Sequence, residues 1–410
     1  MDKAPLLLFS EARDLILQAA KSINYHKTES IPLFEAVNRI VAHPVISPMN
    51  VPSFNNSAMD GYVIRQTDLA SSQALPIAGS LFAGQKQSVS WPKNSCLRIM
   101  TGAKVPDDAY AVIMQEDVQK QGESISFDAD KIKQGQNIRY IGESIKIGSE
   151  IFTTGEKLSI AKLSTLATLG LKEITVFKPL KVAIFSTGDE LTPIGEPLVS
   201  ANQIYDSNRF TLHLMLKALG CDVINLGILQ DDLALITDTL KQAANQADIV
   251  ITSGGVSVGD ADYTKMALEQ IGKIDFWKIA IKPGKPFAFG QIDNAFFCGL
   301  PGNPVSALVT FYQLVRPLIL TQYQVKHDQH TLLLKTTSQL KKSLGRVDFQ
   351  RGRIYSNAQG ERVVESTGEQ GSHITSSFNQ ANCFIILEKD RGHVRQGELV
   401  TVEPFDSTLL

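Results

Sequence analysis

Apolar residues near the N-terminus recur at the spacing of an amphipathic helix. A second, shorter helix is expected over residues 32–40, and a third over residues 159–169, where Gly170 gives a stop signal. Because residues 139–178 are too few to fold alone, we expect them to pack against the N-terminal helices. Residues 1–45 and 139–178 then form a helical, mixed linker domain. The apolar face of the first helix consists of Leu7, Leu8, Ala12, Leu15, Ile16 and Ala19.

Short apolar runs separated by Gly and Pro occupy residues 46–138. Closely spaced strands of this kind predict a small β barrel or sandwich. The module lies between the two halves of the linker domain, so we expect it to be a β-rich insertion. Residues 327–410 show the same kind of pattern and predict a C-terminal all-β, barrel-like domain.

Between residues 179 and 326, short apolar runs alternate with helical periods. One such helix has Leu212, Leu216 and Leu219 on a single face and ends at Gly220. The alternation predicts a central doubly wound α/β domain. Ligands bind beyond the carboxyl ends of the strands in such a sheet, so candidate chemistry is expected there.

Length and charge agree with several globular domains. The chain has 410 residues, more than the roughly 250–300 at which a single core stops growing. The formal net charge of −2 gives no overall attraction to nucleic acid or membrane, so an anionic ligand needs a local basic cluster. The N-terminal apolar run is broken by Glu11 and Arg13, and no stretch approaches the roughly 18 apolar residues of a membrane span. We therefore expect a cytoplasmic protein.

The cysteines are far apart and contain no CxxC pair. This spacing argues against a zinc site and against a disulfide framework. The residues concerned are Cys96, Cys221, Cys298 and Cys383.

The clearest candidate binding loop spans residues 252–262, after an apolar strand and before a helix. Amides at a helix start can point at one anion, and Gly254 and Gly255 allow a ligand to approach the backbone. The loop is neither the GxGxxG dinucleotide motif nor the lysine-containing nucleotide loop. A tight strand-to-helix turn is the alternative explanation. Ser253, Ser257 and the nearby acids favour anion or Mg²⁺ binding.

Acidic residues follow successive strands of the expected sheet at Glu190, Asp231 and Asp262. Each acid alone is explained as a helix cap, because Asp is common at that position. Capping does not explain the repetition at three strand ends. Converging carboxylates suit Mg²⁺ bound with a phosphate, so these residues are the candidate metal ligands.

A lysine-rich segment contains Lys278, Lys282 and Lys285. Ammonium groups beside carboxylate loops favour an anion clamp, while a solvated loop explains this segment equally well when it is taken alone. Pro301 and Pro304 follow at a helix start, where proline is favoured and backbone amides are exposed.

Two turns of the β-rich insertion carry polar side chains. Asp60 lies within residues 55–62, and Thr101 within residues 100–103. Turn chemistry alone accounts for both residues.

Nine short segments, taken together, carry a family resemblance. In chain order they are NNSAMDGY, IMTGAKVP, STGDEL, DSN, GGVSVGDADYTK, KPGKP, LPGNPVSA, DFQRG and QGSH. They resemble the molybdopterin molybdenumtransferase family, which includes bacterial MoeA and the E domain of gephyrin. The resemblance implies a four-part elongated subunit and a homodimer. Each active site of that dimer lies between the α/β domain of one subunit and the β-rich insertion of the other.

The resemblance also implies an activity, the Mg²⁺-dependent insertion of molybdate into adenylylated molybdopterin with release of AMP. By motif, the residues implied to be catalytic are Asp60, Thr101, Glu190, Asp231 and Asp262, of which Glu190, Asp231 and Asp262 serve the metal. The residues implied to bind substrate are Ser253, Gly254, Gly255, Ser257, Lys278, Lys282, Lys285, Pro301, Pro304, Arg351 and Ser372.

One position departs from the family pattern. The family usually has Gly-Glu-Asp where this chain has Gly142, Glu143 and Ser144. Serine cannot supply a charged carboxylate, so any metal or electrostatic role of that position is in doubt for this chain.

As a hypothesis, the expected mechanism is positioning and charge neutralisation, since no Ser, Cys or His stands in a nucleophile–base pattern. Three alternatives remain: a molybdopterin adenylyltransferase, a gephyrin-like scaffold without turnover, and a general nucleotide-binding module. The expected partners are adenylylated molybdopterin, molybdate and a second copy of the chain. A molybdopterin adenylyltransferase and molybdoenzyme chaperones are further candidates, and neither nucleic acid nor a membrane is expected.

Overall fold

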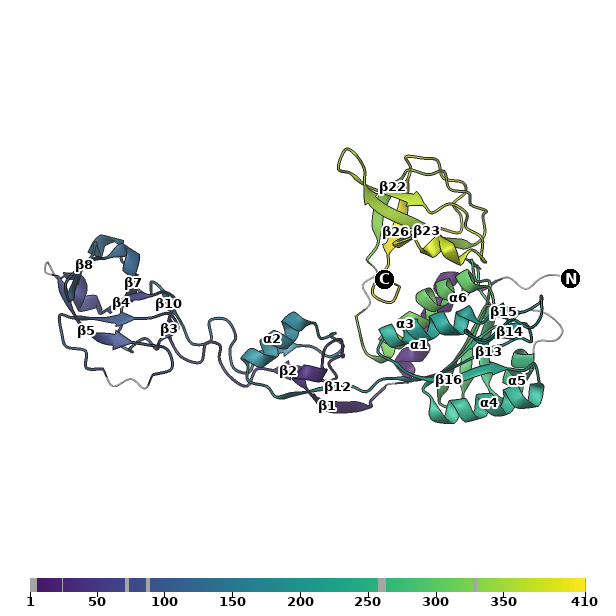
Figure 1. Ribbon diagram of the computed structural model, residues 1–410, viewed down its shortest axis with the longest axis horizontal. Coiled ribbons are helices and arrows are strands. Elements are labelled where there is room, and N and C mark those ends of the chain that lie inside the picture. The colour runs from purple at the N-terminus through teal and green to yellow at the C-terminus, as the bar shows by residue number, and fades with distance from the viewer. Residues whose placement is uncertain are drawn as a thin grey trace.

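The computed structural model describes residues 6–23, 25–70, 74–85, 89–256, 263–326 and 330–409. The subunit is elongated and has four parts (Figure 1). The β-rich insertion lies at one end and a small mixed module in the middle. The α/β domain and the C-terminal β domain lie together at the other end.

The sheet of the α/β domain has the strand order β16-β13-β17-β21-β20-β18. The first four strands are parallel, and the pairs β21–β20 and β20–β18 are antiparallel. Parallel strands buried on both faces explain the near-continuous apolar runs in this part of the sequence. The strands are β13 (Lys181–Thr187), β16 (Asp222–Leu229), β17 (Ile249–Ser253), β18 (Lys273–Lys278), β20 (Pro286–Ile292) and β21 (Ala295–Leu300).

Helices cover both faces of this sheet, which confirms the predicted doubly wound architecture. In β13, Val182 and Ile184 pack into one core, and Ala183 and Phe185 pack into the other. The first core is closed by α1, α3, α6 and α7, and the second by α4 and α5. The helices are α1 (Phe9–Ser22), α3 (Ser207–Ala218), α4 (Leu233–Gln246), α5 (Tyr263–Ile271), α6 (Pro304–Thr310) and α7 (Arg316–Gln322).

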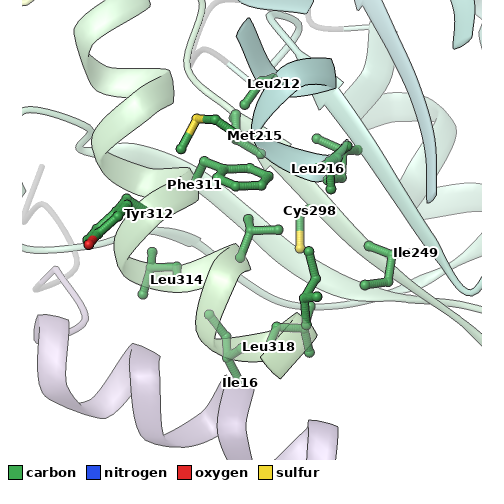
Figure 2. Close-up of a cluster of buried hydrophobic side chains, with 14 of the residues drawn as sticks. Ile16, Leu212, Met215, Leu216, Ile249, Cys298, Phe311, Tyr312, Leu314 and Leu318 are labelled. Carbon is green, nitrogen blue, oxygen red and sulfur yellow. The ribbon is translucent and has the colours of Figure 1, made fainter. Parts of the chain in front are cut away.

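The N-terminal helix α1 packs on the α/β domain, which corrects its predicted place in the linker domain. Ala12 and Ile16 of α1 are buried in the same core as Leu318 of α7. Figure 2 shows Ile16 beside Leu318. The helical period of α1 was predicted correctly, but a period identifies the apolar face of a helix and not the surface that covers it.

A long apolar helix runs through α6, a π-helical turn (Phe311–Val315) and α7. By length and composition alone, Pro304–Gln322 could cross a membrane, which corrects the expectation that no stretch approaches that length. However, 78% of its apolar window is buried inside the protein. Phe311 and Leu314 point into the core, as Figure 2 shows, so it packs as a core helix.

The middle module is smaller than predicted. Strands β1 (Thr28–Pro32) and β12 (Glu173–Phe177) pair antiparallel, and α2 (Ile160–Thr168) packs with them in one core. Ser159 caps α2, as Ser at this position does in many helices. The second helix expected over residues 32–40 is wrong, because only a 3-10 turn (Leu33–Glu35) forms there. The residues after it bond to the backbone of residues 156–158 instead.

The β-rich insertion is a separate β module, as predicted. Its strand order is β7-β4-β6-β5-β9-β8. The short pair β10–β3 lies beside this sheet. The short pair β11–β2 belongs to the middle module, where Phe152 packs in the same core as Leu166 (Figure 1). The strands of this sheet and of the two pairs are β2 (Val45–Ile46), β3 (Asn56–Ser57), β4 (Gly61–Ile64), β5 (Leu75–Leu81), β6 (Cys96–Ile99), β7 (Ala111–Met114), β8 (Gln119–Gln121), β9 (Ser124–Ser126), β10 (Ile138–Arg139) and β11 (Glu150–Phe152).

The C-terminal domain is a closed barrel of five strands, which confirms the barrel-like prediction. The order β23-β24-β22-β26-β25 closes through the β23–β25 pair. A short strand, β19 (Ile281–Lys282), extends from the α/β domain and pairs with β23. The barrel strands are β22 (Leu332–Thr336), β23 (Val347–Ser356), β24 (Arg362–Ser366), β25 (Cys383–Leu387) and β26 (Leu399–Pro404).

Candidate active site

A cavity of about 740 Å³ opens beyond the carboxyl ends of β13, β16, β17 and β21. We call this cavity the crevice. It lies where a doubly wound sheet is expected to bind its ligand. Its lining includes Gly188, Glu190, Tyr205, Asp206, Asn208, Asp231, Ser253, Gly254, Gly255, Tyr263, Pro301, Pro304 and His373.

Two of the predicted metal ligands, Glu190 and Asp231, line this crevice. Partial desolvation raises the pKa of the exposed Asp231, and the negative charges of Asp189 and Glu190 raise it further. The strand-end acids therefore lie close enough to repel one another. Asp262, the third predicted ligand, lies outside the residues that the structure describes, as does Ser257.

The crevice fits a hard divalent cation through its donor chemistry. Carboxylate oxygens held near one another are the ligands that Mg²⁺ prefers, and Mg²⁺ commonly takes only one or two of them together with waters and phosphate oxygens. Over the described ranges, no three His, Cys, Asp or Glu side chains form a complete metal-binding group. Glu190 and Asp231 are thus suited to bind Mg²⁺ together with the phosphate oxygens of a bound ligand.

The glycine loop is held against its neighbours. Gly254 and Gly255 have φ angles of +88° and +65°. A Cβ on Gly255 would lie 2.3 Å from Oγ1 of Thr264 and 2.7 Å from Oγ1 of Thr187. Only glycine combines this backbone conformation with this close packing.

The start of helix α3 places two residues in the crevice, Asp206 and Asn208, that were not among the predicted site residues. Asp206 caps α3, and its Oδ1 accepts a hydrogen bond from the Ser186 hydroxyl at 3.0 Å. Asn208 donates through Nδ2 to Oγ of Ser253 at 2.9 Å and to the carbonyl of Gly302 at 2.7 Å. Both belong to the DSN segment. Its run of polar residues at the start of a helix was the feature of the sequence that could have marked them as site residues.

A second cavity, of about 860 Å³, lies between the α/β domain and the barrel. We call it the basic cavity. Pro286 and Asn303 line both cavities, so the two are neighbours. The predicted residues Lys282, Lys285 and Ser372 line the basic cavity, and Lys341 and Arg346 add charges that the sequence analysis missed. Lys341 and Arg346 reach this cavity because the barrel docks against the α/β domain, and no local sequence pattern predicts that docking.

The three predicted lysines differ in where they lie relative to the cavities. Lys282 donates to Oδ2 of the buried Asp348 at 3.3 Å, which fixes its ammonium group at the cavity wall. Lys285 is exposed at the cavity. Lys278 is exposed at the end of β18 and lines neither cavity.

Arg351 requires a correction. Its side chain is fully buried, with Nε donating to Oγ of Ser377 at 2.9 Å and Nη2 to the carbonyl of Gly371 at 3.3 Å. Burial lowers its pKa to about 10. Arg351 therefore supports the loop beside Ser372 and does not reach either cavity.

Asp60 and Thr101 lie together in the β-rich insertion, at the opposite end of the subunit from the crevice (Figure 1). Within one chain they do not meet Glu190 or Asp231. Nearby in the connection, the carboxylate of Glu143 accepts a hydrogen bond from the amide of Tyr140 at 2.8 Å, and Ser144 is exposed.

Three family profiles match most of the chain. They are the MoeA N-terminal region (domain I and II) over residues 7–170, the probable molybdopterin binding domain over residues 183–321, and the MoeA C-terminal region (domain IV) over residues 334–405. A crystal structure of the MoeA molybdopterin biosynthesis protein from Pyrococcus horikoshii matches with a TM-score of 0.83 and 28% identity, and covers 98% of this chain and 100% of that one. The fold is thus that of MoeA-type proteins.

Two relatives compare at the level of sequence. The molybdopterin molybdenumtransferase of Haemophilus influenzae is 53% identical over 386 residues, which cover 93% of this chain and 95% of that protein. Gephyrin of Dictyostelium discoideum is 34% identical and covers 95% of this chain, but the match spans 61% of gephyrin itself. The chain belongs to the molybdopterin molybdenumtransferase family.

Proposed function

We propose that the protein inserts molybdate into adenylylated molybdopterin and releases AMP, and that it requires Mg²⁺. The observation that carries this proposal is the pairing of an acidic crevice with a neighbouring basic cavity. Glu190 and Asp231 line the first, and Lys282, Lys285, Lys341 and Arg346 line the second.

The two cavities suit the two ends of this reaction. Molybdate is a dianion, so fixed ammonium and guanidinium groups in the basic cavity offset its charge. The phosphates of the adenylylated pterin approach the glycine loop, where the backbone of Gly254 and Gly255 allows close contact. Glu190 and Asp231 would hold Mg²⁺, which would supply positive charge against the phosphoanhydride.

We propose further that each active site is completed by a second subunit. Asp60 and Thr101 are at the far end of the same chain, so they reach a crevice only in a homodimer (Figure 1). An antiparallel arrangement of two elongated subunits brings the insertion of each to the crevice of the other. Cytoplasmic localisation and delivery of the substrate by a separate adenylyltransferase belong to the same proposal.

A reconstituted reaction tests the function. Purified protein is mixed with adenylylated molybdopterin, Mg²⁺ and increasing molybdate, and both AMP release and pterin-bound molybdenum are followed. The expected result is one AMP released per molybdenum inserted, with no reaction when Mg²⁺ is chelated. Binding without either product indicates a scaffold. In a second mixture that holds ATP and molybdopterin instead, incorporation of AMP into molybdopterin indicates an adenylyltransferase.

A further inference from the structure

The side chain of Asn208 joins two loops of the crevice. It lies in the first turn of α3, where the capping residue Asp206 fixes the helix start. Its Nδ2 reaches Ser253 at the end of β17, where the glycine loop begins, and Gly302 in the loop after β21. With 8% of its surface exposed, Asn208 has little freedom to adopt another orientation.

The carbonyl of Gly302 determines which way the amide of Asn208 faces. A carbonyl only accepts hydrogen bonds, so the nitrogen and not the oxygen of the amide must be directed to it at 2.7 Å. The same nitrogen then donates to Oγ of Ser253 at 2.9 Å. Ser253 is therefore an acceptor in this contact, and among the described residues its hydroxyl hydrogen has no acceptor. Because Ser253 lines the crevice, a ligand can be that acceptor.

The amide of Asn208 is only partly satisfied. Oδ1 of Asn208 is buried and has no hydrogen-bond partner in the part of the chain that the structure describes. An unpaired buried acceptor opposes folding, and such groups are rare in native proteins. The amide thus holds Ser253 and Gly302 through its nitrogen while its own oxygen stays unpaired, which favours a specific role for this orientation.

We propose that Asn208 is a positioning residue, which orients the Ser253 hydroxyl as a hydrogen-bond donor to a phosphate oxygen of the nucleotide in the crevice. The proposal rests on the proposed function, since it takes the adenylyl group as the occupant. Asn208 acts through Ser253 and does not itself touch the ligand.

AMP and adenosine distinguish this role from a structural one, because only AMP has the phosphate. Equilibrium binding of each probe is measured for the full chain and for four variants: Asn208→Ala, Ser253→Ala, the double variant, and Asn382→Ala. Asn382 is the matched control, because its amide also bridges backbone groups but lies in the barrel. Thermal unfolding of each variant is recorded alongside.

Both single variants at the crevice are expected to bind AMP roughly 10-fold or more weakly, since a hydrogen bond to a charged group is lost. Their affinity for adenosine is expected to be unchanged. The double variant is expected to be no weaker than Ser253→Ala alone, because the two residues act through one contact. Asn382→Ala is expected to bind both probes like the wild type.

Unchanged AMP binding in Asn208→Ala, an equal loss for adenosine, or additive losses in the double variant would each overturn the inference and leave the proposed function intact. Wild-type protein that binds neither AMP nor adenosine would overturn the nucleotide occupant and the inference together.

Discussion

Oδ1 of Asp60 accepts two hydrogen bonds from Thr101, one from the backbone amide and one from the hydroxyl, each at 2.7 Å. The backbone bond and then the hydroxyl bond lower the pKa of Asp60 below its ordinary value. A depressed pKa favours the folded state above the ordinary value, and this contribution is lost as the pH falls through the folded value. Asp60 is therefore an oriented, ionised carboxylate at neutral pH.

Variants of Asp60 and Thr101 are expected to lose activity to different degrees. Asp60→Asn is expected to lower molybdenum insertion at least about 100-fold, because the charge is removed. Thr101→Ala keeps the backbone bond and loses only the hydroxyl bond, so a loss of roughly 10-fold is expected. Thr101→Ser, which keeps both donors, serves as the control. Equal rates for Thr101→Ala and wild type would contradict a role for this hydrogen bond.

The glycine loop predicts a packing effect that can be separated from backbone strain. Gly255 and Gly122 have similar φ angles, +65° and +60°, but a Cβ on Gly122 would meet nothing within 4 Å. Gly122→Ala is expected to lower the free energy of unfolding by about 1 kcal/mol, the cost of the backbone conformation alone. Gly255→Ala is expected to cost more and to weaken AMP binding. Urea unfolding and AMP titration of both variants provide the check, and equal effects would contradict the packing argument.

Repulsion between Asp231 and the neighbouring carboxylates predicts that Asp231→Asn has opposite effects on stability and on activity. A raised folded pKa means that ionisation of Asp231 disfavours the folded state as the pH rises through that value. Without Mg²⁺, Asp231→Asn is expected to keep or raise the melting temperature at pH 7, with no gain at low pH where the carboxyl is protonated. The insertion rate is expected to fall.

The melting temperatures of wild type and Asp231→Asn are measured at pH 7 and at low pH, with and without Mg²⁺. Asp238→Asn on the exposed side of α4 is the matched control for loss of one negative charge. A lower melting temperature for Asp231→Asn at pH 7 would show that its carboxylate stabilises the fold instead.

The buried guanidinium of Arg351 predicts a structural phenotype. Arg351→Ala leaves the Ser377 hydroxyl and the Gly371 carbonyl without their donor, so the free energy of unfolding is expected to fall by roughly 2 kcal/mol or more. Arg351→Lys should not restore it, because lysine lacks the planar fork of donors. Urea denaturation measures the loss, while Arg346→Ala, which lines the basic cavity, is expected to weaken molybdate use with little change in stability. The reverse pattern would place Arg351 at the ligand.

Local sequence patterns predicted the parts of the chain whose structure is set locally. The strands and helices of residues 180–322 were predicted because both faces of the sheet are buried, so the apolar runs are long and regular. Of the three strand-end acids expected to share a crevice, Glu190 and Asp231 line the same cavity, since parallel strands end at one edge, and Asp262 lies outside the described residues.

Contacts between distant segments were not predictable in the same way. The amphipathic period of α1 does not reveal that it packs on α7 rather than on the linker. Arg351 was taken for a ligand residue because the family resemblance implied it, and the sequence does not reveal that its side chain is buried. Asn208 was missed because its importance lies in two hydrogen bonds to residues 45 and 94 positions away in the chain.

The most direct test of the central claim mixes two defective subunits. Asp60→Asn and Glu190→Gln are co-expressed with different tags, and the mixed dimers are isolated and assayed for AMP release coupled to molybdenum insertion. If each site combines the crevice of one subunit with the insertion of the other, each mixed dimer has one intact site. An unselected mixture should then regain about a quarter of wild-type activity, and isolated mixed dimers about half. Mixed dimers as inactive as the two parent variants would contradict a shared molybdenum-inserting site.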